Sequence, residues 1–332
     1  MQFELLARAR RLRGWDKVIA RNEWFQRKVV SVLSAYQPLT INSQPVLFSY
    51  SYAARDIFRF AKAKGWKTVL GQIDPGPVEE EVVRAEHEAQ PEFGSDWRPA
   101  PPKYWQTWRE ECELADTIII NSDWSRRASE RAGANRQKLS VIPLAYEPPA
   151  DDSPITHKYP DRFTPERPLR VLFLGQVNLR KGVARLLEAA QALRNEPVEF
   201  WMVGPRQCRP PEQLRRLKNV RWFGRVAHAN AAQYYRDADI FILPTLSDGF
   251  ALTQLEAQAH GLPVIASRRC GEVVRDGING IVLEEPTPDA IVAALQFCLR
   301  NPDQLAQFSE NATVGERFSL SCLGTNLCTL AL

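Results

Sequence analysis

Two carboxylates eight positions apart, Asp248 and Glu256, flank a segment whose residue types suit the binding of a phosphate group. Asp248 lies in a short turn after an apolar run, and Glu256 lies on the second turn of a predicted helix. The start of a helix offers backbone N–H groups that lack intrahelical partners and favour an anion. Carboxylates would repel that anion, so we expect them to accept hydrogen bonds from hydroxyl groups attached to it. A phosphate flanked by polyhydroxylated groups describes a sugar nucleotide.

The backbone between the two carboxylates supplies the expected donors for a diphosphate. Its residues are Gly249, Phe250, Ala251 and Leu252, and the helix is predicted to begin near Ala251. Helical side chains lean toward the amino terminus of their helix, so Glu256 can reach back toward the turn. Each residue also has an ordinary structural interpretation. The glycine could simply mark a turn, the aspartate could cap the helix, and the glutamate could be a charge on the helix surface.

A second predicted strand-to-helix turn carries two adjacent cations, Arg180 and Lys181, between Gly175 and Gly182. Lysine acts as a point charge and arginine as a fork of donors, so the pair suits a phosphate clamp. Two solvated loop cations are the alternative. The turn lacks the P-loop spacing, and the chain has no GxGxxG, so dinucleotide binding of that type is unsupported.

Other candidates follow further predicted strands. Gly204 ends one strand, and Arg225 and Val226 follow another, where backbone groups could meet the edge of a nucleobase. In the first half of the chain, Asp74 is a candidate catalytic contact in a cleft. An aspartate before a Pro-Gly pair is also an ordinary turn signature, which remains the competing interpretation.

Parallel sheets would bring these residues together. Short apolar strands alternate with helices, which predicts an α/β fold of two doubly wound, Rossmann-like domains. The expected strands are 46–49, 68–70, 117–121, 139–143, 169–175, 199–204, 220–223, 240–244, 264–266 and 280–283. The expected helices are one or two within 1–36, then 53–63, 122–132, 183–193, one through 234–235 and one from about 251. Ligands of such sheets bind at the carboxyl ends of the strands, so 175, 204, 224 and 248 should share one edge.

Composition and length bound the function. The 332 residues suffice for two α/β domains, and a proline-rich run over 148–168 places the boundary, giving domains at 1–160 and 161–332. A net charge of +4 is too small to argue for nucleic acid. Six scattered cysteines without zinc-site spacing indicate reduced thiols in a cytoplasmic protein, with no metal and no cofactor expected.

Membrane insertion is not expected from this sequence. No apolar stretch approaches the ~20 residues of a membrane span, and the first residues are too charged for a signal peptide. The basic stretch 1–36 leaves open a peripheral contact with an anionic, inner membrane surface. A solvated helix face is the alternative.

The motifs together resemble the retaining GT-B glycosyltransferases, specifically family 4 (glycosyl transferases group 1). Gly175, Lys181 and Gly182 match that family's GxxxxxKG turn, and Asp248 and Glu256 match its E(x7)E motif. The segments HGLPVIAS and GEVVRDGINGIVLEE extend the similarity over 169–310. Upstream, ELADTIIINSDWSRRASERAG resembles the end of the family's acceptor domain.

The resemblance implies transfer of a sugar from a nucleotide-diphosphate sugar donor to a hydroxyl acceptor, with retention and without a metal. The acceptor would be a growing glycan, a lipid-linked molecule or a small molecule, as in polysaccharide biosynthesis. Lys181 and the backbone amides would stabilise the departing diphosphate, Glu256 would bind ribose and Asp248 the donor sugar. The alternatives are a nucleotide-sugar-binding protein with little or no turnover, or a nucleotide-sugar epimerase.

The chain departs from the family pattern at several places. Asp248 stands where glutamate is usual, and Gln176 stands where the family often has arginine. The first domain lacks the family's opening strand and glycine-rich loop, so we expect an incomplete acceptor domain. The final segment, LSCLGTNLCTLAL, replaces the usual charged last helix.

Overall fold

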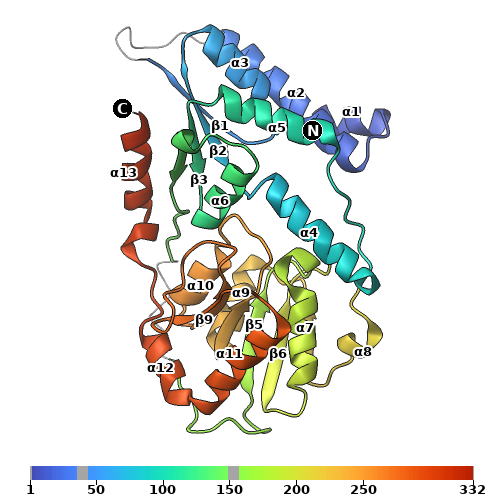
Figure 1. The fold of residues 1–332 in the computed structure, drawn as a ribbon, viewed down its shortest axis with the longest axis vertical. Helices are drawn as coiled ribbons and strands as arrows, with labels where there is room; N and C mark the ends of the chain where they lie inside the picture. Colours follow the sequence, from blue (N-terminus) through green and yellow to red (C-terminus); the bar gives the residue numbers. More distant parts are fainter. Residues whose placement is uncertain (1, 36–43, 149–156, 332) are drawn as a thin grey trace.

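The computed structural model describes residues 2–35, 44–148 and 157–331. Two α/β halves are stacked along the long axis of the molecule, and each is built around a parallel sheet (Figure 1). The predicted pair of parallel sheets is therefore confirmed. In these ranges no helix combines the length and apolar character that crossing a membrane requires.

The first sheet has four parallel strands in the order β1-β2-β3-β4. The middle strands are apolar and buried, which a parallel sheet requires because connecting helices cover it. The strands are β1 (Val46–Tyr50), β2 (Lys67–Gln72), β3 (Thr117–Ile120) and β4 (Leu139–Val141).

Helices α1 to α6 belong to this half. The basic stretch at the start, for which one or two helices were expected, forms two helices. Two further helices lie within 71–114. Ser122 caps α6 by accepting the Ser125 N–H. The helices are α1 (Gln2–Ala9), α2 (Gly14–Ser34), α3 (Arg55–Ala63), α4 (Pro77–Ala89), α5 (Pro102–Leu114) and α6 (Asp123–Arg131), with short 3-10 turns η1 (Pro91–Phe93) and η2 (Arg136–Lys138).

The second sheet has six parallel strands in the order β10-β9-β8-β5-β6-β7. The chain runs outward from β5 through β6 to β7, and then returns to place β8 on the other side of β5. This reversal makes the sheet doubly wound. The strands are β5 (Leu169–Leu174), β6 (Val198–Val203), β7 (Val220–Gly224), β8 (Ile240–Leu243), β9 (Val264–Ser267) and β10 (Gly280–Leu283).

The helices of the second half pack on both faces of this sheet. One boundary differs from expectation: α10 begins at Thr253 rather than near Ala251, because Ala251 has a left-handed backbone with φ of +67°. The elements are η3 (Leu179–Lys181), α7 (Val183–Ala192), α8 (Glu212–Arg215), η4 (His228–Asn230), α9 (Ala231–Asp237), α10 (Thr253–Ala259), α11 (Pro288–Arg300), α12 (Pro302–Glu310) and η5 (Glu316–Phe318).

The last helix, α13 (Leu320–Ala331), returns to the first half of the molecule. Leu323 packs against the buried Val69, Ile119 and Ile142 of the first sheet. A division of the chain into domains at residue 161 stays a prediction. The last helix departs from a simple division of that kind, because it follows residue 161 in the sequence but packs on the first half. Where the chain crosses back, Phe318 C=O accepts a hydrogen bond from the N–H of Tyr146 at 2.9 Å.

Candidate functional site

The turns after β5 and β8 meet where the strand order of the second sheet reverses. Neighbouring strands β5 and β8 run in the same direction, so both turns leave from the carboxyl edge of the sheet. Such a reversal opens a crevice in which α/β sheets bind ligands. Gly175 and Asp248 follow these two strands, while Gly204 follows β6 and Gly224 ends β7. The predicted gathering of these four positions at one edge is confirmed.

The two cations after β5 contact the carboxylate after β8. Lys181 Nζ forms an ion pair with Asp248 Oδ2, and Arg180 Nη1 lies 3.1 Å from the same oxygen. The Asp248 side chain is only 12% exposed. Burial acts to raise the pKa of Asp248, but Lys181 and Arg180 outweigh it and lower the pKa. Asp248 is therefore held as an anion between two cations.

Backbone geometry brings the two turns this close. Asn178 Oδ1 accepts the Lys181 N–H at 3.0 Å and so closes the η3 turn. Gly182 then has a left-handed backbone with φ of +74°, and a Cβ there would lie 1.9 Å from the carbonyl oxygen of Pro244. Only glycine fits this position, because the chain after β5 touches the backbone after β8.

The segment predicted to bind a diphosphate has open donors. Phe250 N–H is used locally, since it donates to Asp248 Oδ1 at 3.2 Å. In the described structure the N–H groups of Gly249, Ala251 and Leu252 make no hydrogen bond. These donors lie beside Asp248, which is the arrangement that the sequence predicted.

Glu256 lies in α10, but its carboxylate has a partner that the sequence did not reveal. Its Oε2 accepts a hydrogen bond from the hydroxyl of the buried Tyr235 at 2.7 Å. Burial, together with the negative charge of Glu256, raises the pKa of Tyr235 well above its ordinary value. The tyrosine therefore stays a donor and fixes the carboxylate. The sequence placed Tyr235 only on a helix, with no spacing to link it to Glu256.

The predicted nucleobase contacts stay predictions. Arg225 is exposed after β7, and Val226 packs against the core cluster on one face of the second sheet. Gly204 already donates its N–H to Gly224 C=O at 2.7 Å, and a Cβ at Gly204 would lie 1.7 Å from the carbonyl oxygen of Gly175. Close backbone packing thus explains Gly204 without any ligand.

Asp74 faces the same crevice from the first half. Tyr52 donates its hydroxyl to Asp74 Oδ1, as do Gly76 N–H at 2.9 Å and Gln72 Nε2 at 3.2 Å. Burial raises the pKa of Asp74. The second oxygen, Oδ2, makes no hydrogen bond with any described residue. One oxygen is therefore fixed by three donors and the other is available.

Glu79 was missed by the sequence reasoning and lies between the two halves. Its Oε2 is 3.6 Å from Arg180 Nη1 and has no hydrogen-bond partner among the described residues. Burial raises the pKa of Glu79 to about 7, although Arg180 opposes the shift. The available signal was the proline at the start of α4 followed by acidic residues in its first turn.

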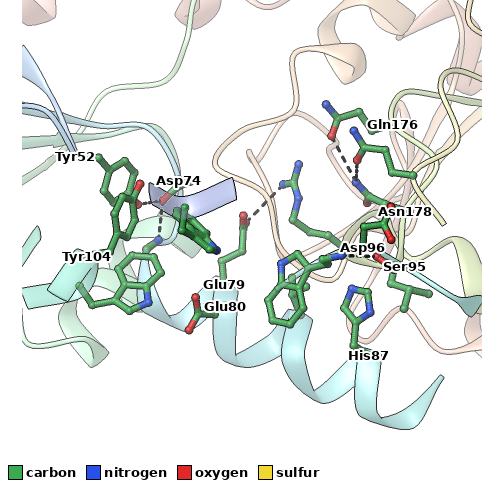
Figure 2. Close-up of a pocket in the computed structure, with 18 of the residues that line it drawn as sticks. Tyr52, Asp74, Glu79, Glu80, His87, Ser95, Asp96, Tyr104, Gln176 and Asn178 are labelled. Atoms are coloured by element: carbon green, nitrogen blue, oxygen red, sulfur yellow. Dashed lines mark hydrogen bonds and ion pairs between the residues drawn. The ribbon is translucent and has the colours of Figure 1, made fainter. Parts of the chain in front are cut away.

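A cavity of 650 Å³ separates the two walls of the crevice. Figure 2 shows Tyr52, Tyr104 and Asp74 on one side and Gln176 and Asn178 on the other, with the acidic start of α4 between them. Neither tyrosine carries a sequence motif, so the aromatic part of this wall was not predicted.

The two halves also touch directly beside the site. A Cβ at Gly249 would lie 2.2 Å from the carbonyl oxygen of Ile73, so the loop after β8 packs on the loop after β2. Trp124 Nε1 donates to Ser247 Oγ at 3.0 Å across the same junction. These contacts bring the loop that carries Asp74 against the loop that carries Asp248. No group of three or more His, Cys, Asp or Glu side chains within the described ranges is arranged to hold a metal ion.

The match to a known family model lies in the second half of the chain. Residues 168–301 match the family model described as glycosyl transferases group 1. D-inositol 3-phosphate glycosyltransferase from Geodermatophilus obscurus is 29% identical over 224 residues, which cover 58% of this chain and 47% of the relative. D-inositol 3-phosphate glycosyltransferase 2 from Catenulispora acidiphila is 31% identical over 60% of this chain and 52% of its own length. The chain spans about half the length of the curated relatives it matches.

Solved structures share the fold across both halves. The Anabaena protein HepE in complex with UDP-glucose has a TM-score of 0.64 at 17% identity, over 92% of this chain and 81% of that chain. Sucrose-phosphate synthase from Thermosynechococcus elongatus has a TM-score of 0.69 at 19% identity, over 96% of this chain and 79% of that chain. The α/β fold with two parallel sheets is that of GT-B glycosyltransferase structures.

Proposed function

We propose that this protein transfers a sugar from a nucleotide-diphosphate sugar to a hydroxyl acceptor. The observation that carries the proposal is the meeting of Arg180, Lys181 and Asp248 at the strand-order reversal of the second sheet. Cations and open backbone N–H groups suit the diphosphate, and carboxylates suit sugar hydroxyls. The cavity toward Asp74 leaves room for an acceptor on the facing wall.

The donor is the better supported substrate. Similar solved folds hold UDP or UDP-glucose, which supports a nucleotide-sugar donor here. We propose that Lys181 turns from Asp248 to the diphosphate when the donor binds. Asp248 then accepts hydrogen bonds from the donor sugar, and Glu256, fixed by Tyr235, accepts them from ribose.

The proposed reaction belongs to the retaining, family 4 type and uses no metal. The bond between the anomeric carbon and the phosphate oxygen breaks, and the acceptor oxygen attacks from the face that the phosphate leaves. The acceptor proton passes to the departing phosphate oxygen. Lys181, Arg180 and the N–H groups near Gly249 stabilise the negative charge that develops on the diphosphate, an effect of about 100-fold or more per donor.

Calorimetry with UDP-, GDP- and ADP-glucose, followed by transfer and donor-hydrolysis assays, tests this proposal. We expect Lys181→Ala and Glu256→Ala to lower transfer at least 100-fold while the fold persists by circular dichroism. Lys218→Ala is the matched control, because Lys218 is an exposed lysine before β7, at the opposite edge of the sheet. Transfer at the original rate by Lys181→Ala would contradict the site assignment. Donor binding without hydrolysis or transfer would favour the alternative, a nucleotide-sugar-binding protein.

A cytoplasmic location with peripheral membrane contact, and a role in polysaccharide biosynthesis, are also proposals. The observation behind the contact is that Arg8, Arg10 and Arg21 are exposed on α1 and α2 and in the bend between them. Clustered basic side chains are attracted to anionic lipid surfaces. Co-sedimentation with vesicles that is independent of phosphatidylserine content would contradict this contact. The relatives are named for D-inositol 3-phosphate, which makes the presence or absence of a phosphate on the acceptor the feature to test.

A further inference from the structure

The cavity beside the proposed donor site has an acidic wall. The residues of the first half that line it include four carboxylates, whereas none of its lining residues from the described part of this half is lysine or arginine. The carboxylates are Asp74, Glu79, Glu80 and Asp96. An acceptor that enters from this side therefore meets negative charge.

The two cations that line the cavity, Arg180 and Arg206, both come from the second half. Arg180 pairs with Asp248 at 3.1 Å and lies 3.6 Å from Glu79. Arg206 lies over the ring of Trp222 at 5.8 Å from its centroid. The proposed function assigns Arg180 to the donor diphosphate. Arg206 keeps its charge, but it belongs to the second half, so no described cation lies on the first-half wall beside a phosphate of the acceptor.

The four carboxylates differ in what they can offer. Glu80 is fully used, since Oε1 pairs with Arg84 at 2.8 Å and Oε2 accepts Ala100 N–H at 2.5 Å. Asp74 Oδ2 makes no hydrogen bond with a described residue, and Asp96 is exposed at the cavity. Available carboxylate oxygens are acceptors only, so they suit hydroxyl groups and repel anions.

Aromatic rings form the rest of this wall. Tyr52 and Tyr104 stack at 5.0 Å with 18° between their planes, and Trp15 lies 4.9 Å from Tyr104. A second stack, of His87 on Trp97, lies at 4.8 Å and 8°. Ring faces offer an apolar surface beside polar groups that fix orientation, which is how small-molecule pockets are built. The apolar C–H face of a sugar ring and its hydroxyl rim match this surface.

We propose that the acceptor is an uncharged carbohydrate, a polyhydroxylated ring without phosphate. It binds in this cavity against the aromatic wall, with Asp74 Oδ2 accepting a hydrogen bond from one of its hydroxyls. The proposal rests on the proposed function and adds the acceptor class to it. A phosphorylated sugar is disfavoured because its dianion would lie among carboxylates with no cation of the same wall beside it.

Transfer to matched pairs of acceptors tests the proposal with the full chain and the nucleotide-glucose that calorimetry selects. The panel contains glucose, galactose, mannose and N-acetylglucosamine, their disaccharides, and the 6-phosphate of each monosaccharide. We expect at least one neutral sugar to have a kcat/KM at least tenfold above that of its own phosphate. Preference for a phosphate, or donor hydrolysis without transfer to any neutral sugar, would overturn the acceptor class. Absence of donor binding and hydrolysis would instead overturn the proposed function.

Two charge-reversal variants test whether the preference for neutral over phosphorylated acceptors comes from the acidic wall of the cavity. Asp96→Lys should narrow the neutral-to-phosphate ratio about fivefold, as expected for a charge reversal near solvent, whereas Glu166→Lys should leave it unchanged. Glu166 is exposed before β5, at the other edge of the second sheet. An unchanged ratio in Asp96→Lys would contradict the electrostatic argument.

Removal of an aromatic face gives a second, independent readout. Tyr104→Ala should raise the KM of the neutral acceptor about tenfold. Its UDP affinity and melting temperature should equal those of the Tyr104→Phe variant, which keeps the aromatic ring. Tyr50→Ala is the matched control, because Tyr50 is 62% exposed and outside this cavity. If Tyr104→Ala changed UDP affinity as much as acceptor KM, the role of Tyr104 would be general packing and the acceptor wall would be wrongly placed.

Discussion

Replacing Gly249 with alanine should separate the two halves of the candidate site. Gly249 lies in the loop after β8, and a Cβ there would be 2.2 Å from the carbonyl oxygen of Ile73 in the first half. The backbone of Gly249 is outside the left-handed region, so alanine can adopt it without local strain. The substitution therefore acts on the contact between the halves rather than on the fold of either.

The magnitude follows from that distance. Real Cβ atoms approach backbone oxygens no closer than about 3–3.4 Å, so the two loops must move apart by about 1 Å. Both partners are backbone, and neither can rotate away as a side chain would. A displacement of about 1 Å between reacting groups costs about 100-fold in rate, or about 2.7 kcal/mol of activation free energy. Alanine keeps the N–H at position 249 that is proposed to meet the diphosphate, so UDP affinity should change much less than the transfer rate, by less than about threefold.

Steady-state transfer and UDP calorimetry on Gly249→Ala measure the two quantities separately. Gly277→Ala is a control within the same half, since Gly277 faces open space with φ of +69° and is outside the site. Its transfer rate should stay near that of the unchanged protein. Equal rates for Gly249→Ala and the unchanged protein would refute the view that this contact sets the distance between the two walls. A fall in rate that came only with loss of UDP binding would refute it as well.

Three further predictions concern stability, measured by urea unfolding. Gly182→Ala should lower the free energy of unfolding by about 2–4 kcal/mol, because the added Cβ meets a backbone carbonyl at 1.9 Å, whereas Gly133→Ala, in open space, should cost about 1–2 kcal/mol. Burial raises the pKa of Glu79 from 4.5 to about 7, so the native state keeps a proton that the unfolded state loses, and stability should fall as the pH rises from about 4.5 to 7. This loss is up to about 3 kcal/mol, and Glu79→Gln should abolish it; an unchanged slope would contradict the burial argument. Asp239→Ala should cost about 1–3 kcal/mol, because the buried Asp239 accepts hydrogen bonds from Arg167 and from Arg170 N–H that alanine leaves unmade, while the exposed Glu284→Ala should leave the urea midpoint unchanged.

The donor side of the site could be predicted from the sequence because parallel strands all end at one edge. Once strands were expected before Gly175 and Asp248, their convergence followed from topology. The start of α10 could not be predicted in the same way. Ala251 adopts a left-handed backbone that an alanine rarely has, and no residue type in the sequence signals it.

The acceptor side lay mostly beyond sequence reasoning. Asp74 was found because it follows a strand, but Tyr52, Tyr104 and Trp97 come from three separate segments and share no spacing. Tertiary packing alone brings their rings to one wall. Glu79 was missed for a different reason, because its burial between two halves cannot be inferred from the sequence of one half alone.

The second crossing of the chain between the halves limits how they can move. The chain passes from the first half to the second near Tyr146 and returns near Phe318, and a hydrogen bond of 2.9 Å joins the two crossings. Helices α7 and α4 lie on the other side of the molecule (Figure 1). They are joined there by side chains, since Arg185 Nη2 lies 2.7 Å from Glu86 Oε2. Two covalent connections side by side restrict translation of one half past the other. We therefore expect the easiest relative motion to be a rotation about an axis through the two crossings, which would change the width of the acceptor cavity.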